Sequence, residues 1–449
     1  MFSIVWSDTT SGAMPLIAKC RSRNSIQLVQ HEISRISCST GELRTDSHAW
    51  EQRQLGESFN MLRNNTLSRA DLSNDRKGIL DIHYGDVLIR YRAVVDVSTL
   101  QGPSINITDN RFLGDQLTDG DIIMADTAED TSAGKCVEIE GVMHRNVVAG
   151  LHTIPLRPAT PSSHRYWGQY LNSASFRNQL FSKMQGTKVI SLSRTTVSNA
   201  TVRYPSLPEQ RRIGEFFSAI DNLIAAAERQ EALLRQKKQA YLQLMFPKEG
   251  ETEPLVRFAG FNEQWQQRQL GEVAEIVGGG TPDSSNADYW DGDIDWYIPS
   301  EIGESRIVQA SARKITREGL NHSSARLLPA GSILFTSRAS IGLMAFISHP
   351  SATNQGFQSL IPNGEVDPDF LYALGPCISR YAKKHAAGST FIEISGSSLA
   401  KAPLRIPRLP EQRLIGQLFS TFDKIISAAE QQIESLQMSK AAYLQRMFI

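Results

Sequence analysis

The chain repeats itself in a way that restricts its architecture. Residues 207–246 and 409–448 align without a gap at an offset of 202 positions, and 23 of the 40 aligned pairs are identical. A shorter repeat opens each half, because residues 50–57 match residues 265–272 at seven of eight positions. The sequences between these markers differ. Two copies are too few for a solenoid, so we expect two variable segments and two constant segments related by two-fold pseudosymmetry.

The markers also divide the chain, whose 449 residues suggest two to four domains. We predict an N-terminal extension of unknown role at 1–49, a first variable domain at 50–206, a central helix at 207–247, a linker at 248–264, a second variable domain at 265–408 and a C-terminal helix at 409–449. The linker begins with a mostly charged run between Pro247 and Pro254, which is typical of a connecting segment.

Both constant segments carry the apolar stripe of a coiled coil, with intervals that alternate between four and three residues over more than four heptads. The residues that we expect in the helix–helix contact are Ile213, Phe217, Ile220, Ile224, Leu234 and Tyr241 in the first segment, and Ile415, Phe419, Phe422, Ile426, Leu436 and Tyr443 in the second. A related pair within one chain packs most simply antiparallel, as a rod of ~50 Å with one variable domain at each end. The alternative is two ordinary amphipathic helices, each covering the core of its own domain.

One position of the stripe is charged in both copies, where Lys238 and Lys440 stand. We interpret these lysines as long side chains whose stems are buried and whose amino groups reach water.

Short apolar runs alternate with turn signals in both variable domains, as at 120–124, 136–139 and 331–335, and these runs predict strands. Stretches such as 166–185 and 370–387 predict helices. The expected fold class is therefore α/β in the mixed α+β sense. Two such domains are separated by two long helices that form an intramolecular antiparallel coiled coil.

The charge is unevenly spread, although 47 Lys and Arg balance 47 Asp and Glu. Residues 141–205 contain eight Arg and Lys and no acid, and residues 370–408 contain six Arg and Lys and one acid, Glu393. Two basic tracts in equivalent places favour neutralisation of DNA phosphates. The alternative is a solvated surface whose cations pair with acids elsewhere in the fold.

Several classes of protein are disfavoured. The four cysteines are scattered, which fits a cytoplasmic protein without a disulfide scaffold or zinc site. No apolar run is long enough for a membrane span, and the N-terminus does not resemble a signal peptide. Neither a phosphate-binding loop nor a methyltransferase, nuclease or metalloprotease motif is evident, so we expect no catalytic activity and no cofactor in this chain.

In combination, the motifs resemble those of the specificity subunit of a type I restriction–modification enzyme. The two helices begin with L-P-E-Q-R-x-I-G and end with Y-L-Q-x-M-F, and each domain opens with W-x-Q-R-Q-L-G-E. The second domain resembles a common target-recognition domain through motifs at 279–282, 289–294, 337–342 and 353–357. The first domain resembles another subtype through motifs at 65–69, 83–86, 125–130 and 150–153. The resemblance covers about residues 50–449.

The resemblance implies a non-catalytic subunit in which each domain reads one half of a split, asymmetric target in double-stranded DNA and the paired helices set the gap. It implies two modification subunits, which dock on the helices and methylate adenine with S-adenosylmethionine. It also implies two restriction subunits, which use ATP and Mg²⁺ to translocate and cleave DNA. Two alternatives stay open: a diverged methyltransferase or nuclease that acts alone, and a coiled-coil adaptor that does not bind DNA.

Within this family, polar and basic residues near the motifs are the expected DNA contacts. In the first domain we predict Arg69, Arg90, Arg92 and Lys188, and in the second Thr336, Ser337, Arg338, Asn354, Gln355, Ser389 and Thr390. An alternative for Asn354 and Gln355 is that they hold the domain together through hydrogen bonds to the backbone.

Overall fold

The structure is a computed structural model that describes residues 50–73, 78–105, 114–186, 188–303, 305–388 and 392–448. The predicted extension at 1–49 therefore lies outside the described residues. The chain forms two compact units, and both long helices are divided between them. The first-domain unit contains described residues 50–229 and 430–448, and the second-domain unit contains described residues 230–429.

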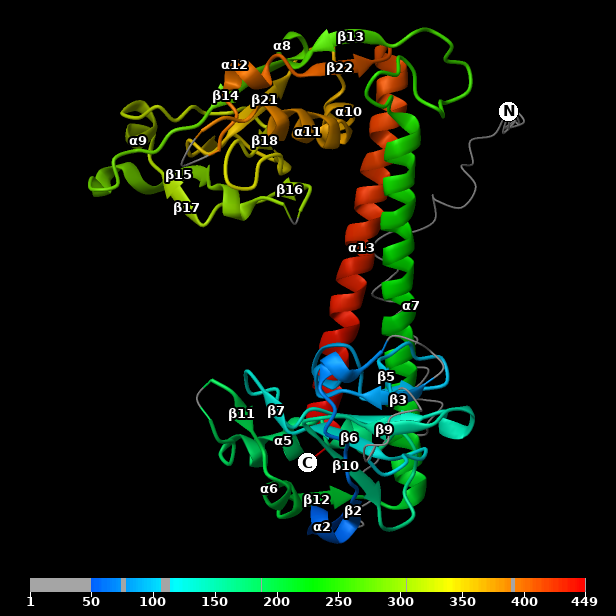
Figure 1. Cartoon of the computed structure of the whole chain (residues 1–449). Helices are drawn as coiled ribbons and strands as arrows, with labels where there is room; N and C mark the ends of the chain where they lie inside the picture. The colour runs from blue at the N-terminus through cyan, green and yellow to red at the C-terminus, as the bar shows by residue number, and fades with distance from the viewer. Residues whose placement is uncertain are drawn as a thin grey trace. The chain divides into compact units, whose positions relative to one another are not determined.

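The first-domain unit is built around a five-stranded sheet (Figure 1). Its strand order is β2 (Phe59–Met61), β10 (Thr153–Pro158), β6 (Ile122–Ala125), β8 (Cys136–Glu140) and β4 (Val94–Asp96). All neighbours are antiparallel except β8 and β4, which are parallel. A second sheet has the order β5 (Ser104–Ile105), β3 (Ile79–Ile82) and β9 (Val147–Ala149), with β3 antiparallel to β5 and parallel to β9.

The second-domain unit repeats this plan with different residues. Its five-stranded sheet has the order β14 (Ala274–Gly278), β21 (Gln358–Pro362), β18 (Ile333–Phe335), β19 (Met344–Ile347) and β16 (Ile307–Val308). Again only the last pair is parallel. The three-stranded sheet has the order β17 (Arg313–Ile315), β15 (Trp290–Tyr297) and β20 (Ala352–Thr353), with β15 antiparallel to β17 and parallel to β20. The pseudosymmetry thus extends to domain interiors whose sequences differ.

Short ladders and helices complete the two domains. In each, the strand of the opening motif pairs antiparallel with the strand before the long helix: β1 (Glu51–Gln54) with β12 (Thr201–Tyr204), and β13 (Gln266–Gln269) with β22 (Pro403–Ile406). The first domain also has a ladder of β7 (Thr127–Ala128) with β11 (Ile190–Ser191). Its helices are α2 (Leu55–Ser58), α3 (Tyr84–Ile89), α4 (Trp167–Tyr170), α5 (Ala174–Phe181) and α6 (Arg194–Ser198). The second has α8 (Leu270–Val273), α9 (Arg317–Asn321), α10 (Pro368–Ala373), α11 (Gly375–His385) and α12 (Gly396–Leu399).

The constant segments form the long helices α7 (Leu207–Met245) and α13 (Leu409–Met447). In the first-domain unit the ring of Phe216 lies 4.9 Å from that of Tyr443, and in the second-domain unit the ring of Tyr241 lies 5.8 Å from that of Phe422. Within each unit, the portions of α7 and α13 that belong to it run in opposite directions (Figure 1). The predicted fold class is confirmed.

The apolar stripe contacts the other helix and also covers the core of a variable domain, so the coiled-coil prediction and the alternative of amphipathic helices both describe part of it. Most of its predicted residues are buried: Ile213, Phe217, Ile220, Ile224, Ile415, Phe419, Phe422, Ile426 and Leu436. Several of them pack into the core of the variable domain as well as against the other helix. Leu234 and Tyr443 are half-buried, and Tyr241 is 40% exposed. The stripe is therefore mostly buried, and Tyr241 is its most exposed predicted residue.

The L-P-E-Q-R-x-I-G motif attaches each helix to the backbone of its domain. Gln210 donates from Nε2 to the carbonyl of Pro205 and accepts from the amide of Ser163. The equivalent Gln412 donates to the carbonyl of Pro407 and accepts from the amide of Asp367. Both glutamines are buried, so these bonds are shielded from water.

The glycine of the same motif permits the close approach. A Cβ atom on Gly214 would lie 2.9 Å from the carbonyl oxygen of His164, and one on Gly416 would lie 2.7 Å from the amide nitrogen of Phe370. Both positions therefore require a residue without a side chain, which explains why the two copies share this glycine.

The Y-L-Q-x-M-F motif ends each helix inside a domain core. Phe448, at the end of α13, packs in the first-domain unit with its ring 6.3 Å from that of Trp50. Phe246, after α7, packs in the second-domain unit with its ring 6.2 Å from that of Trp265. Each opening tryptophan therefore meets the final phenylalanine of a long helix. Within the described residues, no helix combines the length and the apolarity that a membrane span requires.

Candidate nucleic-acid interface

Most cations of the first basic tract bind other groups of the protein. Of its eight cations, six make hydrogen bonds or ion pairs with protein groups: Arg145, Arg157, Arg165, Arg177, Arg194 and Arg203. Lys183 and Lys188 are exposed and have no such bond in the described part of the chain. The alternative interpretation, in which the cations pair within the fold, therefore describes most of this tract.

In the second basic tract, most cationic side chains have no partner within the described residues. Lys384 and Arg408 pair with Glu249 and Glu263. The remaining cations are Arg380, Lys383, Lys401 and Arg405, and their side chains form no hydrogen bond or ion pair within the described residues. The tract's only acid, Glu393, accepts a hydrogen bond from Ser337 at 3.2 Å. This tract therefore has cations available for an anionic ligand.

Four motif segments of the first domain converge on one region. Asn65 donates from its amide group to the carboxylate of Asp81 at 2.6 Å and to the carbonyl of Ala149 at 3.0 Å. The imidazole of His152 lies 3.5 Å from the carboxylate of Asp126. Segments 65–69, 83–86, 125–130 and 150–153 are thus held together, although they are far apart in sequence.

Two arginines share one buried carboxylate in this region. Asp86 lies in helix α3, and its oxygens receive Arg69 at 2.9 Å and Arg90 at 3.1 Å. Both guanidinium groups remain about half exposed. The shared carboxylate restricts both arginines, and Nη2 of Arg90 also donates to the carbonyl of Gln101 at 3.3 Å. The exposed part of each guanidinium suits the recognition of a base edge or a phosphate.

Aromatic rings lie beside these arginines. The ring of Tyr84 lies 4.6 Å from that of His83 and 5.3 Å from that of His152. His152 has a φ of 57°, which is uncommon for a residue with a side chain. Our sequence predictions did not include Tyr84 and His152 as contacts, although both stand in the motifs that carried the resemblance.

The other two contacts predicted in the first domain differ from each other. Arg92 donates to the carbonyl of Asp221 and pairs with Glu228 at 2.5 Å, so its guanidinium is engaged by helix α7. Lys188 is exposed. The structure thus places Arg69, Arg90 and Lys188 at the surface, and Arg92 against the helix.

In the second domain, three motif loops meet. The amide of Gly280 donates to the carbonyl of Thr353 at 2.8 Å, and the amide of Ser337 donates to the carbonyl of Gly356 at 2.8 Å. Between them, Gln355 is exposed and its side-chain oxygen accepts from the hydroxyl of Thr281 at 2.5 Å. Arg338 is half-buried beside Gly356. These loops bring together the polar surface groups Arg338, Gln355 and Thr281.

Two predicted contacts in this region face inward. Thr336 is buried and its hydroxyl donates to the carbonyl of Ser340, while Ser337 is buried and donates to Glu393. Their hydroxyls shape the loop that carries Arg338. Asn354 accepts from the amide of Gly356 at 2.8 Å, as the alternative interpretation for this residue expected. Ser389 and Thr390 lie outside the described residues.

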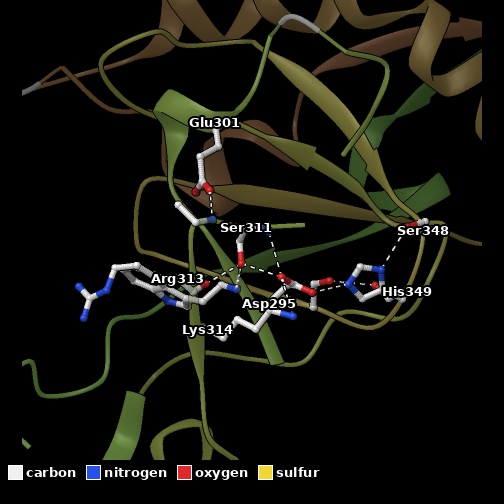
Figure 2. A network of polar contacts seen from close by, with 10 residues as sticks. Asp295, Glu301, Ser311, Arg313, Lys314, Ser348 and His349 are labelled. Carbon is white, nitrogen blue, oxygen red and sulfur yellow. Dashed lines mark hydrogen bonds and ion pairs between the residues drawn. The ribbon is translucent and has the colours of Figure 1, made fainter. Parts of the chain in front are cut away.

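A polar network fixes the neighbouring three-stranded sheet (Figure 2). The buried carboxylate of Asp295 accepts from the amide of Ser311 at 2.9 Å, from its hydroxyl at 2.8 Å and from His349 Nε2 at 2.6 Å. Lys314 lies 3.6 Å away. Burial would raise the pKa of Asp295, but the hydrogen bonds from Ser311 and His349 outweigh it and lower the pKa below the usual value.

The same sheet presents an arginine to the surface. The guanidinium carbon of Arg313 lies 3.7 Å from the ring centroid of Trp290, which is a cation–π contact. Figure 2 shows Arg313 pointing away from the Asp295 network. Nothing in the sequence distinguished Arg313 from other exposed cations, because the contact depends on the pairing of β15 with β17.

Two buried carboxyls of the first domain have raised pKa values. Burial raises the pKa of Asp81 to about 6, even though Asn65 donates to it, and the Oδ1 atom of Asp81 has no hydrogen-bond partner. Burial also raises the pKa of Glu138 to about 7, although the amides of Gly168 and Arg165 donate to it. No group of three or more His, Cys, Asp or Glu in the described residues could hold a metal ion.

Comparison with known proteins agrees with this arrangement. Residues 262–438 match the model of the type I restriction modification DNA specificity domain family. This segment holds the second variable domain and most of helix α13. The resemblance read from the motifs is confirmed for this segment.

Individual specificity subunits are similar over part of the chain. The MjaIX specificity subunit of Methanocaldococcus jannaschii is 35% identical over 189 residues, which are 41% of this chain and 44% of the relative. The EcoR124I/EcoR124II specificity subunit of Escherichia coli is 31% identical over 228 residues, which are 48% of this chain and 52% of the relative. The chain thus spans about half the length of these curated relatives.

The fold is similar over a larger part. The crystal structure of the type I restriction–modification S subunit from M. genitalium matches with a TM-score of 0.58 and 13% identity, over 91% of this chain and 98% of that chain. At this identity the likeness concerns the fold.

Proposed function

We propose that the chain is the sequence-specific DNA-binding subunit of a type I restriction–modification complex. Each variable domain, called a recognition domain from here on, reads one half of a bipartite, asymmetric target. Helices α7 and α13 set the spacing of the halves. The observation that carries the proposal is two domains of one topology, with different surface loops, each attached to a copy of a helix repeat that is identical at 23 of 40 positions. An asymmetric split target needs two such different readers. The specificity subunits that resemble the chain support the same role.

In this proposal the chain itself does not catalyse a reaction. Two modification subunits dock on the helices and methylate adenine with S-adenosylmethionine, and two restriction subunits use ATP and Mg²⁺ to translocate and cleave DNA. The cofactors therefore belong to the partner subunits, and the place of action is the cytoplasm, where the DNA is. Support for these partners comes from the motif resemblance alone.

For the DNA contacts, the proposal assigns base reading to exposed groups on the converging loops. These are Arg69 and Arg90 in the first domain and Arg338 and Gln355 in the second, because each combines a restricted geometry with free donor or acceptor atoms. Exposed lysines without protein partners, such as Lys188 and Lys383, suit phosphate contacts.

The test is a methylome of the host with and without this gene. Deletion should remove one split adenine-methylation motif, and the wild-type gene should restore it. Arg338→Ala should relax one base of one half-motif, whereas Lys383→Ala should leave the motif unchanged and weaken binding to all sequences alike. An unchanged methylome in a host with active modification subunits would contradict the proposal.

Two further outcomes would favour the alternatives. Methylation or cleavage of DNA by the purified chain alone would indicate a complete enzyme. Absence of salt-sensitive duplex binding, even with modification subunits supplied, would indicate an adaptor that does not bind DNA.

A further inference from the structure

The predicted role of the two stripe lysines is wrong, because their amino groups are paired. Lys440 binds both carboxylate oxygens of Asp221, at 2.8 and 2.9 Å, within the first-domain unit. Lys238 binds Asp423 at 2.5 Å within the second-domain unit. The two pairs are related by the 202-residue offset of the repeat, since Asp221 corresponds to Asp423 and Lys238 to Lys440. In each unit, therefore, a lysine of one long helix bonds an aspartate of the other.

Each of these aspartates has a second partner, which comes from the recognition domain. In the first-domain unit, the buried amide of Gln169 on α4 donates to the carboxylate of Asp221 at 2.9 Å, and Arg92 donates to the main-chain carbonyl of the same residue. In the second-domain unit, Arg306 pairs with Asp423 at 2.5 Å. The aspartate is therefore a junction of three parts: its own helix, the opposite helix and the domain.

The domain side of the junction is built differently in the two units. Gln169 is neutral, and its Oε1 atom is buried without a hydrogen-bond partner. Arg306 is a cation that also pairs with Asp369 at 2.5 Å, and its guanidinium carbon lies 4.3 Å from the ring centroid of Tyr372. The helix side is constant, whereas each domain supplies a partner of its own.

Stability alone does not explain these junctions. Partly buried ion pairs contribute little net stability, because desolvation offsets most of their attraction, and an apolar pair often fits such a position as well. What these ion pairs provide is a defined geometry, since a polar group in the contact between two helices specifies how its neighbours are arranged. Here the geometry that they specify includes the orientation of a domain on the helix pair.

We propose that Asp221 and Asp423 are positioning residues that fix each recognition domain on the helix pair, and thereby the spacing of the two half-sites that the protein accepts. This rests on the proposed function, because spacing has a meaning only for a split target. The aspartates do not touch DNA. They act through Gln169 and Arg306, so their loss alters which spacings are accepted and leaves the preferred bases of each half unchanged.

The unequal domain partners give a sharp test by exchange of charges. In the first unit, Asp221→Lys with Lys440→Asp keeps the ion pair between the helices, and the free Oε1 of Gln169 can accept from the new cation. The nearby charge of Arg92 is already balanced by Glu228. In the second unit, Asp423→Lys with Lys238→Asp also keeps an ion pair between the helices but places a cation against Arg306. The same exchange should therefore be tolerated in the first unit and not in the second.

The experiment uses the full chain assembled with its modification subunits and a set of duplexes that carry the native half-sites at the native spacing and at one or two base pairs more or less. We expect the first exchange to keep the wild-type preference for the native spacing. We expect the second exchange to reduce that preference at least tenfold, with the bases of both half-sites unchanged. Arg306→Gln added to the second exchange should restore it, because the domain partner then matches that of the first unit.

The outcomes separate this inference from the proposed function. If the wild-type assembly shows no preference for any spacing, the proposed function fails. If the wild type has a preference and both exchanges behave alike, the positioning role is overturned. Should the second exchange fail to fold, recovery of folding and spacing by Arg306→Gln supports the role, and failure to recover contradicts it.

Discussion

Removing one ring near the end of the chain should destabilise the first-domain unit and spare the second. Phe448 is 2% exposed, and its ring lies 5.4 Å from that of Tyr170, 5.8 Å from Phe217, 5.9 Å from Tyr166 and 6.3 Å from Trp50. Truncating a buried phenylalanine to alanine costs about 3–5 kcal/mol through lost burial and the cavity that remains. Four aromatic neighbours place this site near the upper end of the range. We expect Phe448→Ala to lower the free energy of unfolding of this unit by about 4–5 kcal/mol.

The assay is hydrogen exchange read by mass spectrometry over a urea series, since peptides from 50–206 and 265–408 report the two units separately. Protection should fall in the first set of peptides and stay unchanged in the second. Phe246→Ala should give the mirror result, because Phe246 occupies the equivalent place in the second-domain unit. The control is Arg446→Ala, an exposed residue in the last turn of α13. A loss below about 1 kcal/mol for Phe448→Ala, or a loss located in 265–408, would refute the reasoning.

Three further predictions concern pH and packing. Burial raises the pKa of Asp81 to about 6, so the folded state binds this proton more tightly than the unfolded state. The melting temperature should therefore fall as pH rises from about 4 to about 6. Asp81→Asn should reduce that fall and leave the part that comes from Glu138, whose pKa is also raised, and an equal slope in the variant would contradict this. The pKa of Asp295 is lowered, so this carboxylate stabilises the second-domain unit above the ordinary carboxyl pKa and loses that effect on further acidification. Asp295→Asn should therefore make the melting temperature of this unit depend less on pH at the acid end. A Cβ on Gly416 would lie 2.5 Å from Asp367 Oδ1, so Gly416→Ala should cost about 1–3 kcal/mol in urea unfolding, whereas Gly364→Ala, with open space around it, should be neutral.

The long helices could be predicted from the sequence because their signal is local and repeated. The heptad stripe, the two copies and the shared motif each point to one antiparallel pair. The shared topology of the two domains could not be predicted in the same way. Strand order depends on pairs such as β3 with β9, which join residues near 80 to residues near 148, and the two interiors have little sequence in common.

The candidate interface was predicted in part. Motif position led to residues that the structure leaves exposed or half-buried, such as Arg69, Arg338 and Gln355, and their contact with DNA stays a prediction. It could not tell which side of a loop a residue faces, so Thr336 and Ser337 were included although both are buried. Charge clustering was a weaker predictor of cations available to DNA, because an arginine in a basic tract can bind a protein group more than 100 residues away. Arg194, for example, donates to the carbonyl of Leu62.

The constant and variable parts of the chain meet through two kinds of bond, and the difference explains how the domains can diverge. Gln210 and Gln412 bond main-chain amides and carbonyls of the domain, and Gly214 and Gly416 give room to its backbone. Such contacts do not depend on the side chains of the domain, so a domain of quite different sequence can attach to the same helix.

The junctions at Asp221 and Asp423 are the exception, since they bond domain side chains that differ between the two halves. A recognition domain transferred to the other helix position would keep its main-chain attachment, and its own partner, Gln169 or Arg306, would meet an equivalent aspartate there. Such a transfer should therefore preserve folding, and the transferred domain should bring with it both the bases that it reads and its contribution to the accepted spacing. Spacing would thus be a property of the junction between a domain and its helix, in addition to the length of the helices.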